Sequence, residues 1–103
     1  MPFQNNFTPV HPGQIIREDI LPQLNLSVSA AAEALGISRH MLRRVLAARK
    51  PLSAVLCLKL ARFFGCTPEF WMRLQVDYDL KKAVHTPMVM ESLARITPLN
   101  PLR

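Results

Sequence analysis

Apolar residues recur at intervals of three or four along most of this chain, and proline, glycine and serine interrupt them. Such spacing is typical of amphipathic helices, and no segment alternates with the two-residue period of a strand. The interruptions predict helices over residues 12–21, 27–35, 39–46, 53–64 and 67–84. Pro12 suits the first position of a helix, and Pro22 is expected to end that helix. The pattern therefore indicates an all-α protein.

Hydroxyl side chains stand where the later helices should begin, because such side chains accept from the free N–H groups of a first turn. The predicted N-caps are Ser27, Ser38, Ser53 and Thr67. Gly36 and Gly65 are expected to end two of the helices in the left-handed conformation. The segment between Ser53 and Gly65 is the most apolar, so we expect it at the centre of the core.

Residues 29–46, SAAAEALGISRHMLRRVL, combine a helix of small residues, a glycine turn and a capped second helix rich in arginine. Ile37 can fill the corner between the two helices, and Leu42, Val45 and Leu46 share one face of the second. The basic residues left facing outward are Arg39, His40, Arg43 and Arg44. This combination is typical of a helix-turn-helix, whose second helix enters the major groove of DNA.

Charge favours the same interpretation. The chain carries a net charge of +6 over 103 residues and has a pI of about 10.2, which indicates a polyanionic partner. The segment 39–50 contains no acid and holds Arg39, Arg43, Arg44, Arg49 and Lys50. The alternative is a solvated amphipathic helix in a bundle without a nucleic-acid partner. The clustering of basic residues on the predicted recognition helix argues against that alternative.

Residues that could carry catalysis or bind a metal are scattered. The three histidines, His11, His40 and His85, have no metal-binding spacing. Cys57 and Cys66 form no metal-binding pair either, and we expect both to be buried free thiols. The chain has only three glycines and no glycine-rich phosphate loop or serine elbow. We therefore expect a protein that is not an enzyme and that uses no cofactor and no metal.

The opening residues lack the basic and apolar regions of a secretion signal, and no apolar run is long enough to span a bilayer. These features predict a cytoplasmic protein with no membrane partner. We expect an irregular N-terminal arm over residues 1–11, a helix-turn-helix domain over 12–84 and a C-terminal tail over 85–103. Within that tail, residues 88–96 could form one short helix.

Segments on both sides of the helix-turn-helix carry a family resemblance. HPGQIIREDIL at 11–21 and KPLSAVLCLKLARFFGCTPEFWMRLQVDYDL at 50–80 flank the motif, and the match covers about residues 10–82. The chain resembles the HigA-type antitoxins of the XRE helix-turn-helix superfamily. The resemblance implies a five-helix, lambda-repressor-like domain that forms a homodimer, binds double-stranded DNA at a palindromic operator, represses its own operon and neutralises a HigB-type mRNA interferase toxin.

The resemblance also implies roles for particular residues. The family's base-reading positions fall on Arg39, His40, Arg43 and Arg44. Its phosphate-contacting positions fall on Ser27, Ser29, Ser38, Arg49 and Lys50. The chain departs from the family at Ala47-Ala48, where an Asn-Gly usually ends the recognition helix, and at Val28 and Ala31 of the preceding helix. The first departure leaves open how the recognition helix ends, and the other two leave open the phosphate contacts of the preceding helix.

Two further expectations concern aromatic and basic side chains of the later helices. Phe70 and Trp71 should anchor the core and the dimer, with Trp71 helping to bury the interface between subunits. The apolar surface of the helix over 67–84 is the reason to predict a homodimer. Arg62 and Arg73 are expected on solvated faces.

Two other functions remain open. One is a stand-alone transcriptional regulator of the same family that has no toxin partner, and the other is a helical module that binds only proteins. The basic recognition helix argues against the protein-binding module. A neighbouring gene for a small basic ribonuclease-like protein would distinguish an antitoxin from a stand-alone regulator.

Overall fold

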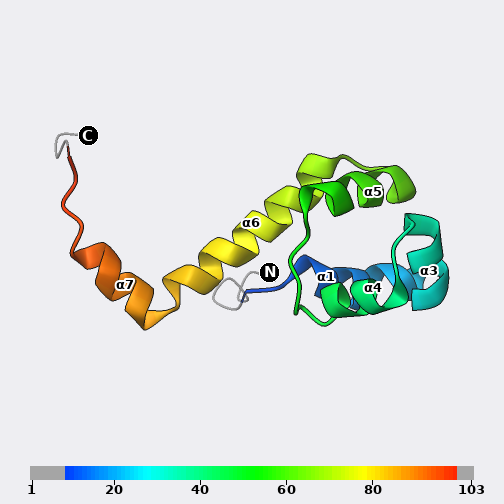
Figure 1. The fold of residues 1–103 in the computed structure, drawn as a ribbon, viewed down its shortest axis with the longest axis horizontal. Coiled ribbons are helices and arrows are strands. Elements are labelled where there is room, and N and C mark those ends of the chain that lie inside the picture. Colours follow the sequence, from blue (N-terminus) through cyan, green and yellow to red (C-terminus); the bar gives the residue numbers. More distant parts are fainter. Residues whose placement is uncertain (1–8, 100–103) are drawn as a thin grey trace.

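The computed structural model describes residues 9–99, and these form helices with no strand among them, which confirms the predicted all-α fold class. The molecule is elongated, with extents of 51 × 27 × 25 Å. Figure 1 shows a rounded part from which α6 carries α7 away. The elements in chain order are α1 (Pro12–Ile15), η2 (Ile16–Ile20), α2 (Leu21–Gln23), α3 (Val28–Leu35), α4 (Arg39–Leu46), α5 (Ala54–Phe64), α6 (Pro68–Val84) and α7 (Pro87–Ala94).

The first three elements form one continuous helix, so the expectation that Pro22 ends it is wrong. A proline inside an α-helix lacks an N–H and clashes with the carbonyl four residues earlier. Here η2 is a π-helical turn in which the Leu21 N–H donates to the Ile16 carbonyl, five residues back. This wider turn accommodates the proline ring. The helix then ends at Asn25, which takes a left-handed φ of 56°.

The predicted caps are confirmed at the later helices. The hydroxyls of Ser27, Ser38 and Ser53 each accept from a backbone N–H three residues on, at 3.0–3.1 Å. The Thr67 hydroxyl caps α6 in the same way. Gly36 and Gly65 take left-handed φ values of 71° and 80°. These local signals fix where α3, α4, α5 and α6 begin and where α3 and α5 end.

The recognition-helix candidate α4 ends without a glycine. The N–H of Ala48 donates to Val45 and that of Arg49 donates to Arg44, at 3.0 and 2.9 Å, which is the hydrogen-bond pattern of a Schellman motif. Ala48 occupies the left-handed position of that motif with φ 62°. Because a Cβ is crowded in this conformation, the chain stores about 1–2 kcal/mol of strain at Ala48.

The core lies where α1–α5 meet the first half of α6. Its largest members are Trp71, Ile16, Leu42, Leu56 and Leu60. The expectation that α5 is central is confirmed for one side of that helix, while Val55, Leu58 and Phe63 on the other side are exposed. Trp71 is 1% exposed, so it belongs to the core of its own chain. The expectation that it helps bury a subunit interface is therefore wrong.

Burial changes abruptly along α6. Gln75 is the last buried residue of this helix, and its Oε1 accepts from the Leu52 N–H at 2.9 Å. Beyond it Tyr78 still packs against the ring of His11, and the helix then leaves the rest of the molecule. We call residues 11–75 the body and residues 76–94 the stalk. The helix predicted within the tail is present as α7, at the end of the stalk, and it buries none of its residues.

Candidate nucleic-acid interface

The helices α3 and α4 with their turn form the predicted helix-turn-helix. Leu42, Val45 and Leu46 are buried against the body, which fixes the orientation of α4 about its axis. The opposite side of α4 is exposed and basic, and it carries Arg39, His40, Arg43 and Arg44. Within residues 9–99 these side chains take part in no ion pair. The base-reading candidates thus form one exposed basic surface.

The residues predicted to contact phosphate lie around the same surface, at the helix ends. Ser27 and Ser38 are exposed and cap α3 and α4, so each stands at the partly positive N-terminus of a helix. The Ser29 hydroxyl accepts from the Arg39 guanidinium at 3.4 Å, which links the first turns of the two helices. Arg49 is exposed and Lys50 half-buried in the loop after α4.

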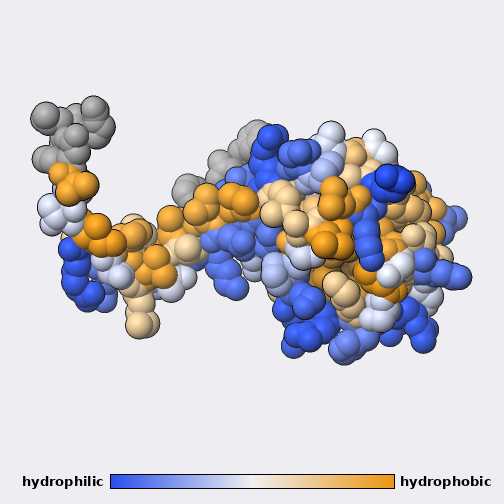
Figure 2. All heavy atoms as spheres, turned by 45° about the horizontal axis from the view of Figure 1, so that its top comes forward, coloured by the Kyte–Doolittle hydropathy of each residue, from blue (hydrophilic) through white to orange (hydrophobic). Residues whose placement is uncertain are grey.

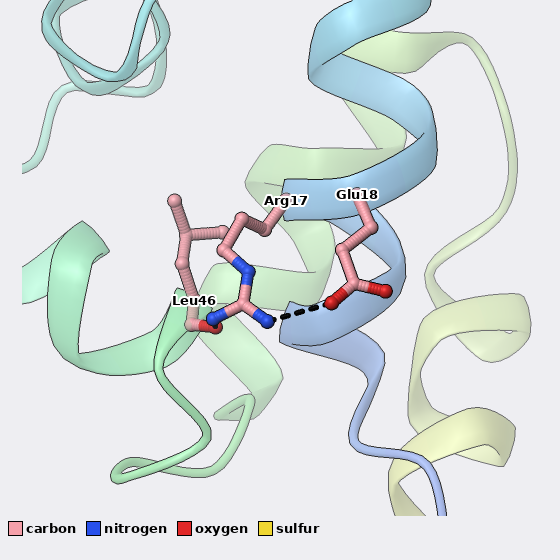
Figure 3. Close-up of polar contacts among 3 residues, drawn as sticks. All are labelled: Arg17, Glu18 and Leu46. Atoms are coloured by element: carbon pink, nitrogen blue, oxygen red, sulfur yellow. Dashed lines mark hydrogen bonds and ion pairs between the residues drawn. The ribbon is translucent and has the colours of Figure 1, made fainter.

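The far end of α4 is held by the first helix, a feature that the sequence reasoning missed. A Cβ placed on Gly13 would lie 2.0 Å from the Val45 carbonyl oxygen, so α1 approaches α4 as closely as only a glycine permits. One turn later, Arg17 Nη1 donates to the Leu46 carbonyl at 3.3 Å, and Nη2 pairs with Glu18 at 2.7 Å (Figure 3). The sequence signal for this contact was the four-residue spacing of Gly13 and Arg17, which places both on one side of the first helix.

His11 belongs to the body although the sequence placed it in the N-terminal arm. It is 3% exposed, and its Nδ1 accepts from the Gly13 N–H at 2.9 Å, so it caps α1. Its ring meets the edge of Tyr78, with centroids 4.9 Å apart. Burial lowers the pKa of His11, and a hydrogen bond to the Lys50 backbone and the Asp79 charge oppose that shift. Residues 1–8 of the arm and 100–103 of the tail lie outside the described residues.

The two thiols differ. Cys57 is buried, and burial raises the pKa of its thiol. Cys66 is exposed, so the expectation of a second buried thiol is wrong; the residue follows the left-handed Gly65 at the surface. Its Sγ accepts from Trp71 Nε1 at 3.0 Å. Over residues 9–99, no group of three or more His, Cys, Asp or Glu side chains could hold a metal ion.

None of the helices between residues 9 and 99 combines the length and the apolar character that crossing a membrane requires.

Comparison with known proteins identifies the fold. The Helix-turn-helix family model matches residues 16–71. The virulence-associated protein I of Dichelobacter nodosus is 35% identical over 94% of this chain and 87% of its own length. Antitoxin HigA-1 of Vibrio cholerae is 33% identical over 70% of this chain and 68% of its own. The solved structure of Pseudomonas aeruginosa antitoxin HigA with the higBA promoter has a TM-score of 0.81 and 32% identity, and covers 89% of this chain and 99% of that one.

This chain belongs to the HigA-type proteins of the XRE helix-turn-helix superfamily. The family model ends at residue 71, where Trp71 completes the core. The likeness to the solved HigA extends well past the residues of that model. This chain therefore shares more with the solved HigA than the two helices of the helix-turn-helix.

Proposed function

We propose that this HigA-type protein is a sequence-specific DNA-binding repressor of its own operon. The observation that carries the proposal is the exposed basic side of α4 on a fold that matches a solved antitoxin HigA with promoter DNA. Phosphates bind unpaired Lys and Arg side chains, and guanine presents two acceptors to an Arg in the major groove. The proposal is for a binding protein acting in the cytoplasm, where operon DNA lies.

The basic surface divides naturally between bases and phosphates. Arg39, His40, Arg43 and Arg44 read base edges, since the recognition helix presents them outward along one side. The phosphate contacts come from helix N-termini and from the loop after α4, since both carry positive charge. The phosphate-contacting residues in this proposal are Ser27, Ser29, Ser38, Arg49 and Lys50. The hydrogen bond that Arg39 donates to Ser29 joins one residue of each group.

The proposed DNA-binding form is a homodimer on a palindromic operator, with half-sites about 34 Å apart. Exposed apolar side chains on the stalk support it, because Val76, Leu80 and Val84 lie in one row along α6 and each is about half exposed or more. Sedimentation at tens of micromolar should show a dimer. A monomer at that concentration would contradict this part of the proposal.

The DNA proposal is tested with a duplex selected by the wild-type protein from a random library. Arg43→Ala or Arg44→Ala should lower affinity for the selected duplex by about 1–3 kcal/mol when that arginine makes a bidentate guanine contact. Arg49→Ala should weaken binding to all duplexes alike and reduce the salt dependence. The matched control is Arg73→Ala, an exposed arginine of α6. Unchanged affinity in both α4 variants would refute the assignment of α4.

We further propose that the protein neutralises a HigB-type mRNA interferase toxin. The likeness to antitoxins, which extends beyond the helix-turn-helix, supports this proposal. The protein is co-expressed with the product of the neighbouring gene, and rescue of growth and a co-purified complex are expected. A folded Arg43→Ala, Arg44→Ala variant should lose operator binding and still rescue growth. No complex with the wild type would favour the stand-alone regulator.

A further inference from the structure

The outer side of α5 leaves apolar side chains uncovered on the body. Val55 and Leu58 are 62% and 58% exposed, and Phe63 is 37% exposed. They line a hollow with a volume of about 1000 Å³, which lies between the end of α3, α5 and the start of α6. Figure 2 turns this side of the body toward the viewer and shows apolar residues gathered there with hydrophilic residues among them. A contiguous apolar surface of this kind is typical of a binding site.

Two cations stand among these apolar side chains. Lys59 and Arg62 also line the hollow, and no acid does so among the described residues. Helical spacing places both cations between Leu58 and Phe63 on the same side of α5. Lys59 Nζ donates to the Gly36 carbonyl at 3.4 Å, and neither cation takes part in an ion pair within residues 9–99. A partner that covers this surface must therefore supply carboxylates, because a cation buried without a counter-charge is costly.

The shape of the surface favours a helix over a small ligand. A small-molecule site encloses most of the surface of its ligand. Val55 and Leu58 project from α5 and are more than half exposed, so they do not enclose one. The distance from Val55 to Phe63 along the axis is about 12 Å, so about two turns of a second helix fit along it. Amphipathic helices bind apolar grooves in this way, with anchors at every third or fourth position.

The hollow is separate from the proposed DNA-binding surface. None of the residues proposed to contact bases or phosphates lines it. Figure 1 shows α4 and α5 on opposite sides of the body, so a partner on α5 leaves α4 free. The toxin proposed above is expected to be a small basic protein, which has the wrong charge for Lys59 and Arg62. The chemistry of the hollow therefore indicates a different, acidic partner.

We propose that the outer side of α5 binds an acidic amphipathic helix of another protein. Apolar side chains of that helix pack on Val55, Leu58 and Phe63, and carboxylates on the same face pair with Lys59 and Arg62. The protein then holds this partner and DNA at the same time through opposite sides of its body. The docking itself depends neither on DNA binding nor on the proposed homodimer or toxin.

A native thiol reports whether the hollow is occupied. Cys66 is exposed and lines the hollow, while Cys57 is buried and should stay unreacted. The probe is a synthetic helix of about 15 residues whose leucines and glutamates share one face. At saturation it should slow alkylation of Cys66 by a water-soluble maleimide several-fold. The matched control peptide has glutamine in place of each glutamate and should protect Cys66 weakly. Unchanged alkylation, or equal protection by both peptides, would overturn the proposal.

Charge reversal tests the pairing with the two cations. The Lys59→Glu, Arg62→Glu variant should bind the acidic peptide about ten-fold more weakly, since two attractive pairs become repulsive. A peptide with lysine in place of each glutamate should bind that variant and not the wild type. The matched control, Arg73→Glu, Arg95→Glu, changes the net charge equally at exposed positions outside the hollow and should bind the acidic peptide like wild type. Equal weakening in both variants would show attraction to net charge alone and would overturn the proposal.

Other occupants of the hollow give different results. Decanoate that protects Cys66 as well as the acidic peptide does would assign the hollow to a small anionic ligand. A DNA duplex that displaces the peptide would assign it to DNA. Protection that grows with protein concentration in the absence of peptide would assign it to a second copy of this chain. Each of these results overturns the proposal, and circular dichroism of each variant alone confirms that its helices are intact.

Discussion

The body buries its large apolar residues, the stalk exposes them, and α6 runs through both. In its first half Trp71 and Gln75, four positions apart, face inward. In its second half the apolar row shifts by one position to Val76, Leu80 and Val84, and this row is exposed. A shift of one residue turns the apolar side by about 100°. Whether a segment of α6 joins the core or stays exposed therefore depends on which side of the helix carries its apolar residues, more than on how many it has.

Replacing one apolar residue in each region should separate the two most strongly. Trp71→Ala should lower the free energy of unfolding by about 3–5 kcal/mol, since it leaves a cavity in the core and removes the indole from Cys66. Val84→Ala in the stalk should change it by less than about 0.5 kcal/mol in dilute protein. Urea denaturation at low concentration measures both. Equal losses would show that Val84 also packs within one chain.

The close approach of the first helix to α4 provides the next largest effect. Gly13→Ala should cost about 1–3 kcal/mol of folding stability, because the new methyl group meets the backbone of Val45, which cannot move aside alone. Gly65→Ala is an informative comparison: its Cβ would have open space, and only its left-handed φ of 80° opposes the change. A Gly13 variant as stable as wild type would mean that α4 is not fixed from this side.

The end of the recognition helix should be open to improvement. Ala48→Gly should stabilise the body by about 1 kcal/mol, the strain relieved being partly offset by the greater freedom of glycine in the unfolded chain. Ala47→Gly is the matched control and should stabilise nothing, since its φ of −86° suits alanine. Thermal unfolding of the two variants measures the difference, and a gain in stability for Ala47→Gly equal to that for Ala48→Gly would contradict the prediction.

Arg17 offers a smaller and more specific effect. Its loss in Arg17→Ala frees the last carbonyl of α4 and should weaken operator binding by about 1 kcal/mol. Because Arg17 acts by positioning α4, the slope of affinity against salt should stay unchanged. A slope reduced by about 1 would instead identify Arg17 as a phosphate contact. Arg17→Lys should restore part of the affinity.

The pH dependence of stability should trace to His11. Its pKa is lowered from 6.5 by burial, so the folded state binds fewer protons than the unfolded state just below that pH. Stability is therefore complete above the ordinary pKa and declines as the pH falls from there. His11→Asn keeps a capping acceptor and removes the titration, so it should flatten this decline. An unchanged pH profile in that variant would assign the titration to another group.

Local chemistry explains how much of the fold was predictable. Serine and threonine caps and two left-handed glycines set the bounds of α3, α5 and α6, and each acts on its own helix. The prediction that Pro22 ends the first helix failed because a π turn accommodates the proline, and no single residue of the sequence indicates a shift to π hydrogen bonding. Cys66 was assigned by residue type, whereas its exposure depends on the position of Gly65.

The candidate site was predictable to a similar extent. The outward direction of Arg39, His40, Arg43 and Arg44 follows from helical spacing once Leu42 and Val45 are buried. The hydrogen bonds of Arg17 to Leu46 and of Gln75 to Leu52 join residues more than twenty positions apart. Such contacts depend on how the helices cross, which the spacing within any one helix does not reveal.

The unbroken course of α6 from Trp71 to Val84 has a consequence for how such a protein can change over time. Substitutions along the outer half alter which surface chemistry is offered and leave the geometry as it is. A single inserted codon there would turn everything beyond it by about 100° and advance it by about 1.5 Å. The loop between α4 and α5 could absorb the same insertion locally. The stalk can therefore become longer without changing the direction of α7 only by insertions of about a whole helical turn.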